Sequence, residues 1–128
     1  MSMKMKVLII EKDKTVRQSL SFFIERYRNF EVFPAGSKKE GESLFNTTPF
    51  DIVLCGDRLP DGNALEILSN WVSQNPKLIS ILMTVHSDER LRQEALMAGI
   101  RGYLVKPFDL KQLEEAISIS DLGLRKVE

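Results

Sequence analysis

The stretch Asp51-Ile52-Val53-Leu54-Cys55-Gly56-Asp57-Arg58-Leu59-Pro60-Asp61-Gly62-Asn63-Ala64-Leu65 decides the fold of this chain. Its apolar run, residues 52–55, lies between Thr48-Pro49-Phe50 and Gly56. A short apolar run between such breakers is typical of a strand buried on both faces of a parallel sheet. The next residues, 60–63, have turn chemistry, and Asn63 can cap a helix that begins at Ala64. The stretch therefore predicts a central strand that ends in a loop at the functional edge of a sheet.

The same kind of pattern recurs along the chain. Apolar runs predict further strands over residues 7–10, 30–35, 78–83 and 102–105. Apolar residues at helical spacing predict a helix after each of the five strands. The expected N-caps of these helices are, in order, Asp13, Ser37, Asn63, Ser87 or Asp88, and Asp109. Trp71, beside the apolar face of the third helix, is expected to be partly covered surface. Five strands alternating with five helices predict a doubly wound parallel sheet with helices on both faces, an α/β/α sandwich.

Composition narrows the class of protein. The 128 residues carry 18 basic and 18 acidic side chains, and no basic stripe favours a nucleic-acid or membrane partner. The single cysteine, Cys55, excludes an internal disulfide and fits a reducing compartment. The first apolar run is too short for a signal peptide or a membrane span. We expect a cytoplasmic protein with one domain over residues 1–122 and a frayed tail over 123–128.

The strand ends bring polar residues together. In a doubly wound sheet the ligand crevice lies outside the carboxyl ends of the strands. The residues that this rule gathers are Glu11, Lys12, Gly56, Asp57, Thr84 and Lys106. They define the candidate site.

With these residues in this order, the chain resembles the receiver domain of response regulators, from about Lys6 to Leu122. The motifs that carry the resemblance are Thr84, Lys106-Pro107, Phe108 and the segments 59–62 and 99–104. The resemblance implies a CheY-like sheet of strand order 2-1-3-4-5 and a non-enzymatic role in two-component phosphorelay signalling. In that family two acids after the first strand hold Mg²⁺, and an aspartate that ends the third strand accepts a phosphoryl group.

Two departures from the family pattern change the expected chemistry. The acceptor aspartate lies four residues before the loop proline, and in this chain that position is Gly56. Asp57 comes one residue late, so its side chain is expected on the opposite face of the sheet. The acid pair reads Glu11 and Lys12. One unit-charge pair at ~4 Å is worth ~4 kcal/mol at an effective dielectric constant near ~20, so replacing an acid with a lysine should abolish useful Mg²⁺ affinity.

These departures predict a pseudo-receiver that has no metal or other cofactor and works without phosphorylation. The alternative is a receiver that is phosphorylated on Asp57 with Mg²⁺. It requires a β-bulge at Gly56 to turn the carboxylate into the pocket, and Asp13 as a further metal ligand. Lys12 is either a solvated loop lysine or an ammonium group that replaces the metal by pairing with Glu11.

The other strand-end residues also have two interpretations. Lys106 is expected to pair with Glu11 or Asp57, and Thr84 to keep a structural hydrogen bond. Tyr103 lies where the family places a rotating switch aromatic, but it fits equally well as a half-buried strand residue.

The resemblance also implies an output surface made by the fourth helix, the fifth strand and the fifth helix, over residues 88–117. It carries mixed charges, among them Arg90, Arg101 and Glu114. The expected partners are proteins: a signalling protein, an output domain or a dimer mate. A switch that is never phosphorylated rests in one state, or is biased by a partner with differential affinity.

Overall fold

The computed structural model describes residues 4–27 and 29–118. The predicted domain end at 122 and the tail at 123–128 lie outside these residues. The central sheet is formed by β1 (Met5–Ile10), β2 (Phe30–Ala35), β3 (Ile52–Gly56), β6 (Ile79–Thr84) and β7 (Gly102–Val105). The helices are α1 (Lys14–Glu25), α2 (Lys38–Thr47), α3 (Ala64–Gln74), α4 (Glu89–Met97) and α5 (Leu110–Ser118). Within the described ranges, no helix has the length and apolar character that crossing a bilayer requires.

The sheet has the order β2-β1-β3-β6-β7, and all its strand pairs are parallel. The predicted order 2-1-3-4-5 is confirmed, because β6 and β7 are the fourth and fifth strands of the prediction. The numbering shifts because the turn after β3 contains a two-stranded antiparallel hairpin, β4 (Arg58–Leu59) and β5 (Gly62–Asn63). The sequence predicted a turn there, and its strand pairing was not foreseen.

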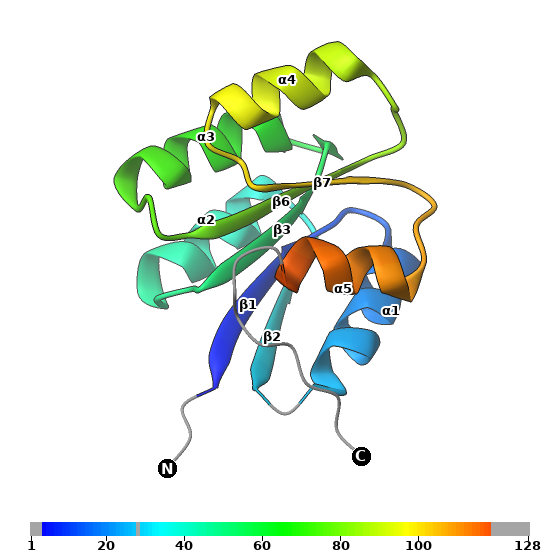
Figure 1. Cartoon of the computed structure of the whole chain (residues 1–128). Helices are drawn as coiled ribbons and strands as arrows, with labels where there is room; N and C mark the ends of the chain where they lie inside the picture. The colour runs from blue at the N-terminus through cyan, green and yellow to red at the C-terminus, as the bar shows by residue number, and fades with distance from the viewer. Residues whose placement is uncertain (1–3, 28, 119–128) are drawn as a thin grey trace.

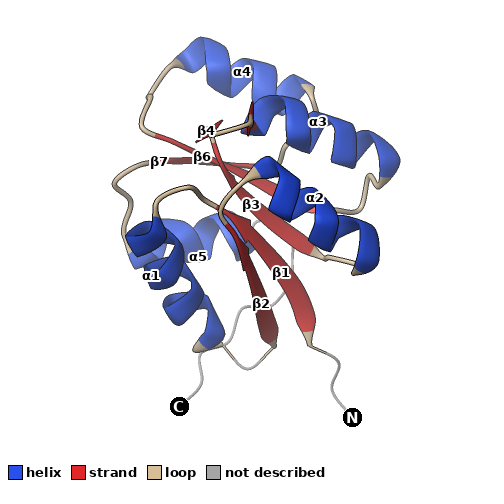
Figure 2. Ribbon diagram, turned by 180° about the vertical axis from the view of Figure 1, so that it is seen from behind, coloured by secondary structure: helices blue, strands red, loops and turns tan. Residues whose placement is uncertain are grey.

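Helices cover both faces of the sheet: α1 and α5 lie on one, and α2, α3 and α4 on the other (Figures 1 and 2). Side chains alternate between the two faces along each strand. In β1, Val7 and Ile9 pack in the core under α1 and α5, while Leu8 and Ile10 pack in the core under the other three helices. This alternation also decides which way the residues at the strand ends point.

The predicted helix caps are confirmed. Asp13, Ser37 and Asn63 each accept a hydrogen bond from the backbone N–H three residues later. Asp88, rather than Ser87, caps α4. Asp109 and Gln112 bond reciprocally at the start of α5, each side chain accepting from the other's backbone N–H. These caps fix where each helix leaves the functional edge of the sheet.

Trp71 is buried, so the prediction of a partly covered surface residue was wrong. Its side chain is 4% exposed, and its ring stacks on Phe45 of α2 at 3.9 Å between centroids and an interplanar angle of 2°. The helical pattern placed Trp71 at the edge of the α3 apolar face. It could not show that the neighbouring helix presents an aromatic ring to that edge.

The turn after β3 is tied to α2. The Asp61 carboxylate accepts hydrogen bonds from the backbone N–H groups of Lys38 at 2.8 Å and of Lys39 at 2.9 Å. These two bonds lower the pKa of Asp61 below its ordinary value of 3.8. The bonds also satisfy two N–H groups that the first turn of α2 leaves without intrahelical partners.

We expect Asp61→Ala to lower the urea midpoint of unfolding at about pH 7. Because the pKa of Asp61 is lowered in the folded state, its contribution is present above the ordinary value of 3.8 and is lost as the pH falls through the folded value. The difference between the variant and the natural chain should therefore be smaller at a pH well below 3.8 than at about pH 7. An equal difference at both pH values would show that the carboxylate charge does not contribute.

Ser80, the second residue of β6, is fully buried, and its hydroxyl group has no hydrogen-bond partner among the described residues. Leaving a buried hydroxyl unsatisfied costs about 1–3 kcal/mol. We expect Ser80→Ala to raise the free energy of unfolding by about 1 kcal/mol in chemical denaturation. Thr84→Val is the matched control, because the Thr84 hydroxyl is also buried but is hydrogen-bonded; it should lower stability. A loss of stability in Ser80→Ala would contradict the account.

Candidate functional site

The candidate residues meet at the carboxyl edge of the sheet, and strand alternation divides them into two groups. Glu11, Gly56 and Lys106 continue the series of residues that face α1 and α5, after Ile9, Leu54 and Leu104 respectively. Asp57 and Thr84 continue the opposite series, after Cys55 and Leu82. The two groups have different contacts.

Glu11 and Lys106 form an ion pair across the edge. The Lys106 Nζ atom lies 2.5 Å from Glu11 Oε1, and Glu11 is 1% exposed. The other carboxylate oxygen, Oε2, accepts the backbone N–H of Asp13 at 2.9 Å. A buried carboxylate is stable only when it is paired and hydrogen-bonded, and both oxygens of Glu11 meet that requirement. The structure thus gives Lys106 the first of its two predicted partners.

Gly56 leaves room for this ion pair. A Cβ atom at Gly56 would lie 2.9 Å from Glu11 Oε1, closer than real Cβ contacts allow. The register between β3 and β6 is regular through this position, one residue opposite one: Cys55 lies opposite Leu82, and Gly56 lies opposite Met83. The bulge that the alternative interpretation requires is therefore absent from β3.

Asp57 contacts Thr84 rather than Lys106. The Thr84 hydroxyl donates a hydrogen bond to Asp57 Oδ2 at 3.1 Å, and Asp57 is half-buried. The Asp57 backbone N–H donates to the carbonyl of Met83 at 2.6 Å, which continues the β3–β6 pairing by one residue. The prediction that Asp57 faces away from the acceptor side agrees with this geometry, and its predicted pairing with Lys106 does not.

Thr84 is also bonded to the loop that follows it. Its hydroxyl oxygen accepts the backbone N–H of His86 at 3.1 Å. The Tyr103 hydroxyl group donates to the carbonyl of His86 at 2.8 Å. Burial, followed by the nearby carboxylates of Asp88 and Asp57, raises the pKa of Tyr103, so the phenol stays protonated as a donor. Tyr103 is half-buried in β7, as one of its two interpretations predicted.

Lys12 is exposed, and the described ion pair of Glu11 is with Lys106. The interpretation in which the Lys12 ammonium group pairs with Glu11 was therefore wrong. Sequence reasoning missed Arg17, whose guanidinium donates to the backbone carbonyl of Glu11 at 2.5 Å and fixes the loop after β1. Its only sequence signal is a place one turn after the Asp13 cap, which does not distinguish it from a surface arginine.

The residues at this edge are a poor match for Mg²⁺. The ion prefers an octahedron of oxygens that includes one or two available carboxylates. Both oxygens of Glu11 are engaged by Lys106 and Asp13, and the Asp13 carboxylate caps α1. The part of the chain that the structure describes contains no group of three His, Cys, Asp or Glu residues suited to a metal.

The residues predicted for the output surface have different surroundings in the structure. Arg90 is exposed and pairs with Glu94 at 3.4 Å, and the Arg101 guanidinium donates to the carbonyl of Pro76 at 3.5 Å. Glu114 instead accepts a hydrogen bond from the hydroxyl group of Tyr27, two residues after α1, so its placement on the output surface was wrong. Glu115 lines a groove of about 250 Å³ between α4, β7 and α5. The helical position of Glu114 fits both sides of α5, and only the contact with Tyr27 decides between them.

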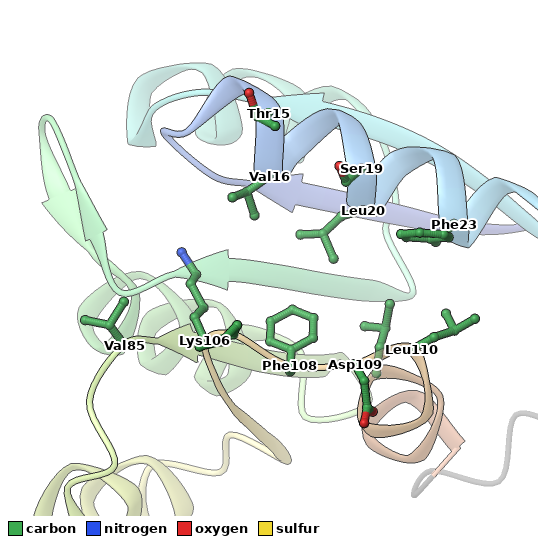
Figure 3. A pocket seen from close by; sticks show the side chains of 12 residues that line it. Thr15, Val16, Ser19, Leu20, Phe23, Val85, Lys106, Phe108, Asp109 and Leu110 are labelled. Carbon is green, nitrogen blue, oxygen red and sulfur yellow. The ribbon is translucent and has the colours of Figure 1, made fainter.

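A second groove, of about 460 Å³, lies between α1 and the segment that joins β7 to α5 (Figure 3). Leu20 and Phe23 of α1 face Phe108 and Leu110 across it, and Lys106 lies at one end. Its lining is mainly apolar. This groove was not predicted from the sequence, because its two walls are distant along the chain.

The comparisons with known proteins agree with this architecture. The sequence profile described as "Response regulator receiver domain" matches residues 7–118. The chain is 29% identical over 119 residues to "DNA-binding transcriptional activator DevR/DosR" of Mycobacterium tuberculosis. The aligned region covers 92% of this chain and 54% of that protein. It is 30% identical over 125 residues to "Response regulator protein PilR" of Pseudomonas aeruginosa, covering 98% of this chain and 28% of that protein. The chain thus spans about a half or less of these curated relatives.

A solved receiver domain from Clostridium thermocellum has a TM-score of 0.81 to this structure and 29% sequence identity, with 91% of this chain and 93% of that chain covered. The profile match, the sequence relatives and the shared structure agree, and this chain belongs to the response regulator receiver domain family.

Proposed function

We propose that this receiver domain works without phosphorylation, as a module that binds protein partners. The observation that carries the proposal is Gly56. It occupies the position at the end of β3 that holds the acceptor aspartate in the family, and it provides no carboxylate nucleophile. Without a nucleophilic oxygen, no acyl phosphate forms at that position.

The electrostatics of the edge support the same proposal. Glu11 is the one acid on the α1/α5 side of the candidate site, and its charge is matched by Lys106 at 2.5 Å. The exposed Lys12 adds a positive charge where the family has a metal-binding acid. A dication approaching this edge would have to displace an ammonium group from a buried carboxylate, which costs several kcal/mol.

The partner surface that we propose is the face made by α4, β7 and α5. Its groove is lined by Arg92, Arg101, Tyr103 and Glu115, together with the exposed Leu96. A mixture of apolar, aromatic and charged side chains is a usual composition for a protein interface. One curated relative is a DNA-binding transcriptional activator and is about twice as long as this chain. We therefore propose that any DNA contact belongs to an attached output domain or a partner.

A second candidate function is phosphorylation of Asp57. One observation favours it: the Asp57 carboxylate already contacts Thr84, the hydroxyl that the family uses beside its phosphoryl group. The even β3–β6 register and the engaged oxygens of Glu11 count against it. The following experiment decides between the two.

We expect no covalent phosphoryl group on the natural chain after incubation with Mg²⁺ and a small-molecule phosphodonor, as measured by intact mass. A parallel sample with Mg²⁺ and fluoroberyllate should show no change in thermal midpoint, because binding of the mimic requires the metal and the acceptor. A working receiver domain treated identically is the positive control. A stable adduct that maps to Asp57 would contradict phosphorylation-independence and support the second candidate.

Two substitutions should restore the metal site. In the double variant Gly56→Asp with Lys12→Asp, the new carboxylates reverse the charge of the edge and give Lys106 a second anionic partner. Mg²⁺ at about ten times its Kd should then stabilise the double variant by about 1.4 kcal/mol, seen as a shift in thermal midpoint. Gly56→Ala with Lys12→Asp is the matched control, because it adds the Cβ atom without the carboxylate. Equal responses of the two variants to Mg²⁺ would contradict the assignment of Gly56 to the acceptor position.

A further inference from the structure

Four residues on the side of the sheet that faces α4 form a continuous hydrogen-bond network. Thr84 Oγ1 donates to Asp57 Oδ2 at 3.1 Å and accepts from the His86 backbone N–H at 3.1 Å. The Tyr103 hydroxyl donates to the His86 carbonyl at 2.8 Å. We call these four residues the Asp57–Tyr103 network. It joins the end of β3, the end of β6, the loop of residues 85–88 and β7.

The Asp57 carboxylate sets the direction of these bonds. An ionised carboxylate can only accept, so the proton of the Thr84 hydroxyl points toward Asp57. The lone pairs of the hydroxyl oxygen are then directed away from Asp57 and are available to the His86 N–H. Thr84 is 1% exposed, so water does not readily replace either partner.

The loop of residues 85–88 has few other contacts; one is Arg58, whose Nη2 atom lies 3.5 Å from His86 Nε2. Val85 is 65% exposed, and His86, Ser87 and Asp88 are exposed as well. The helix that follows is lightly anchored: among the nine residues of α4, all of which the structure describes, Ala95 alone is buried. Segments with few buried contacts open locally at low free energy, so a few hydrogen bonds weigh heavily in their position.

We propose that Asp57 is a positioning residue that holds the loop of residues 85–88, through Thr84, and thereby fixes Tyr103 and the start of α4. Tyr103 lines the groove between α4, β7 and α5, so the proposed partner surface takes its shape from this carboxylate. The carboxylate belongs to the chain itself and is always present. The surface is therefore held in one arrangement by a hydrogen-bond acceptor that needs no modification.

The test measures backbone amide exchange and ring signals by NMR on the unmodified chain. Asp57→Ala should make the His86 amide exchange about tenfold faster, the effect expected from loss of about one hydrogen bond. It should also shift the ring signals of Tyr103. Asp57→Asn keeps an acceptor oxygen for Thr84 and should restore slow exchange. Unchanged exchange in Asp57→Ala, or failure of Asp57→Asn to restore it, would overturn the proposal.

A second pair of variants tests the same network from Thr84. Thr84→Val should reproduce the Tyr103 shift, and Thr84→Ser, which keeps the hydroxyl group, should not. Adding Asp57→Ala to Thr84→Val should cause no further change, because the two residues act in series. An additive effect would contradict the network. This pair keeps the test decisive if Asp57→Ala fails to fold, as judged by circular dichroism.

Asp61→Ala is the matched control, because Asp61 lies in the same turn and its carboxylate bonds to α2 instead. It should leave the His86 amide unchanged. The proposal goes beyond the proposed function and does not depend on it. No phosphodonor is present in the NMR test, so its failure would not bear on phosphorylation, and an adduct on Asp57 would not bear on the network of the unmodified chain.

Discussion

The ion pair between Glu11 and Lys106 is the constraint around which the carboxyl edge is arranged. It joins the residues that follow β1 and β7, two strands that are separated in the sheet by β3 and β6. One of these two intervening strands, β3, ends in Gly56, and a Cβ atom there would lie 2.9 Å from Glu11 Oε1, so the Glu11 carboxylate would have to shift. The glycine and the ion pair are thus two parts of one arrangement. Removing either partner of such a pair leaves an uncompensated buried charge, which costs about 3–5 kcal/mol when burial is complete and less for the partly exposed Lys106.

Moving a carboxylate by one residue along β3 changes which groups it contacts, because the side chains of a strand alternate between the two faces of the sheet. At Gly56 a carboxylate would face Glu11 and Lys106, where the family carries out its chemistry. At Asp57 it faces the opposite side, where Thr84 and the loop before α4 lie. There the carboxylate accepts a hydrogen bond from the Thr84 hydroxyl group. Family membership alone therefore does not define the contacts that these few residues make.

Much of this structure could be predicted from local patterns. Strand positions follow from apolar runs, helix starts from capping residues such as Asp13 and Asn63, and the sheet order from the family resemblance. Contacts between distant segments could not be predicted. Three examples are the hydrogen bonds from Arg17 to the Glu11 carbonyl, from Tyr27 to Glu114, and from Thr84 to Asp57. Each depends on distances in the folded chain that the spacing of residues in the sequence does not encode. The error on Trp71 has the same origin, since its burial is completed by a ring from another helix.

The stack of Trp71 on Phe45 has a consequence for how unfolding of this domain is observed. Trp71 is the single tryptophan in the sequence, and from α3 it packs on Phe45 of α2, in the core on one face of the sheet. Its fluorescence therefore reports on that layer of the molecule. Tyr27 and the other residues packed under α1 and α5 belong to the opposite core and contribute little to tryptophan emission. A tryptophan-fluorescence transition describes unfolding of the whole domain only if it coincides with the transition seen by a probe of the other core. Comparing the two transitions therefore tests whether the domain unfolds in a two-state manner.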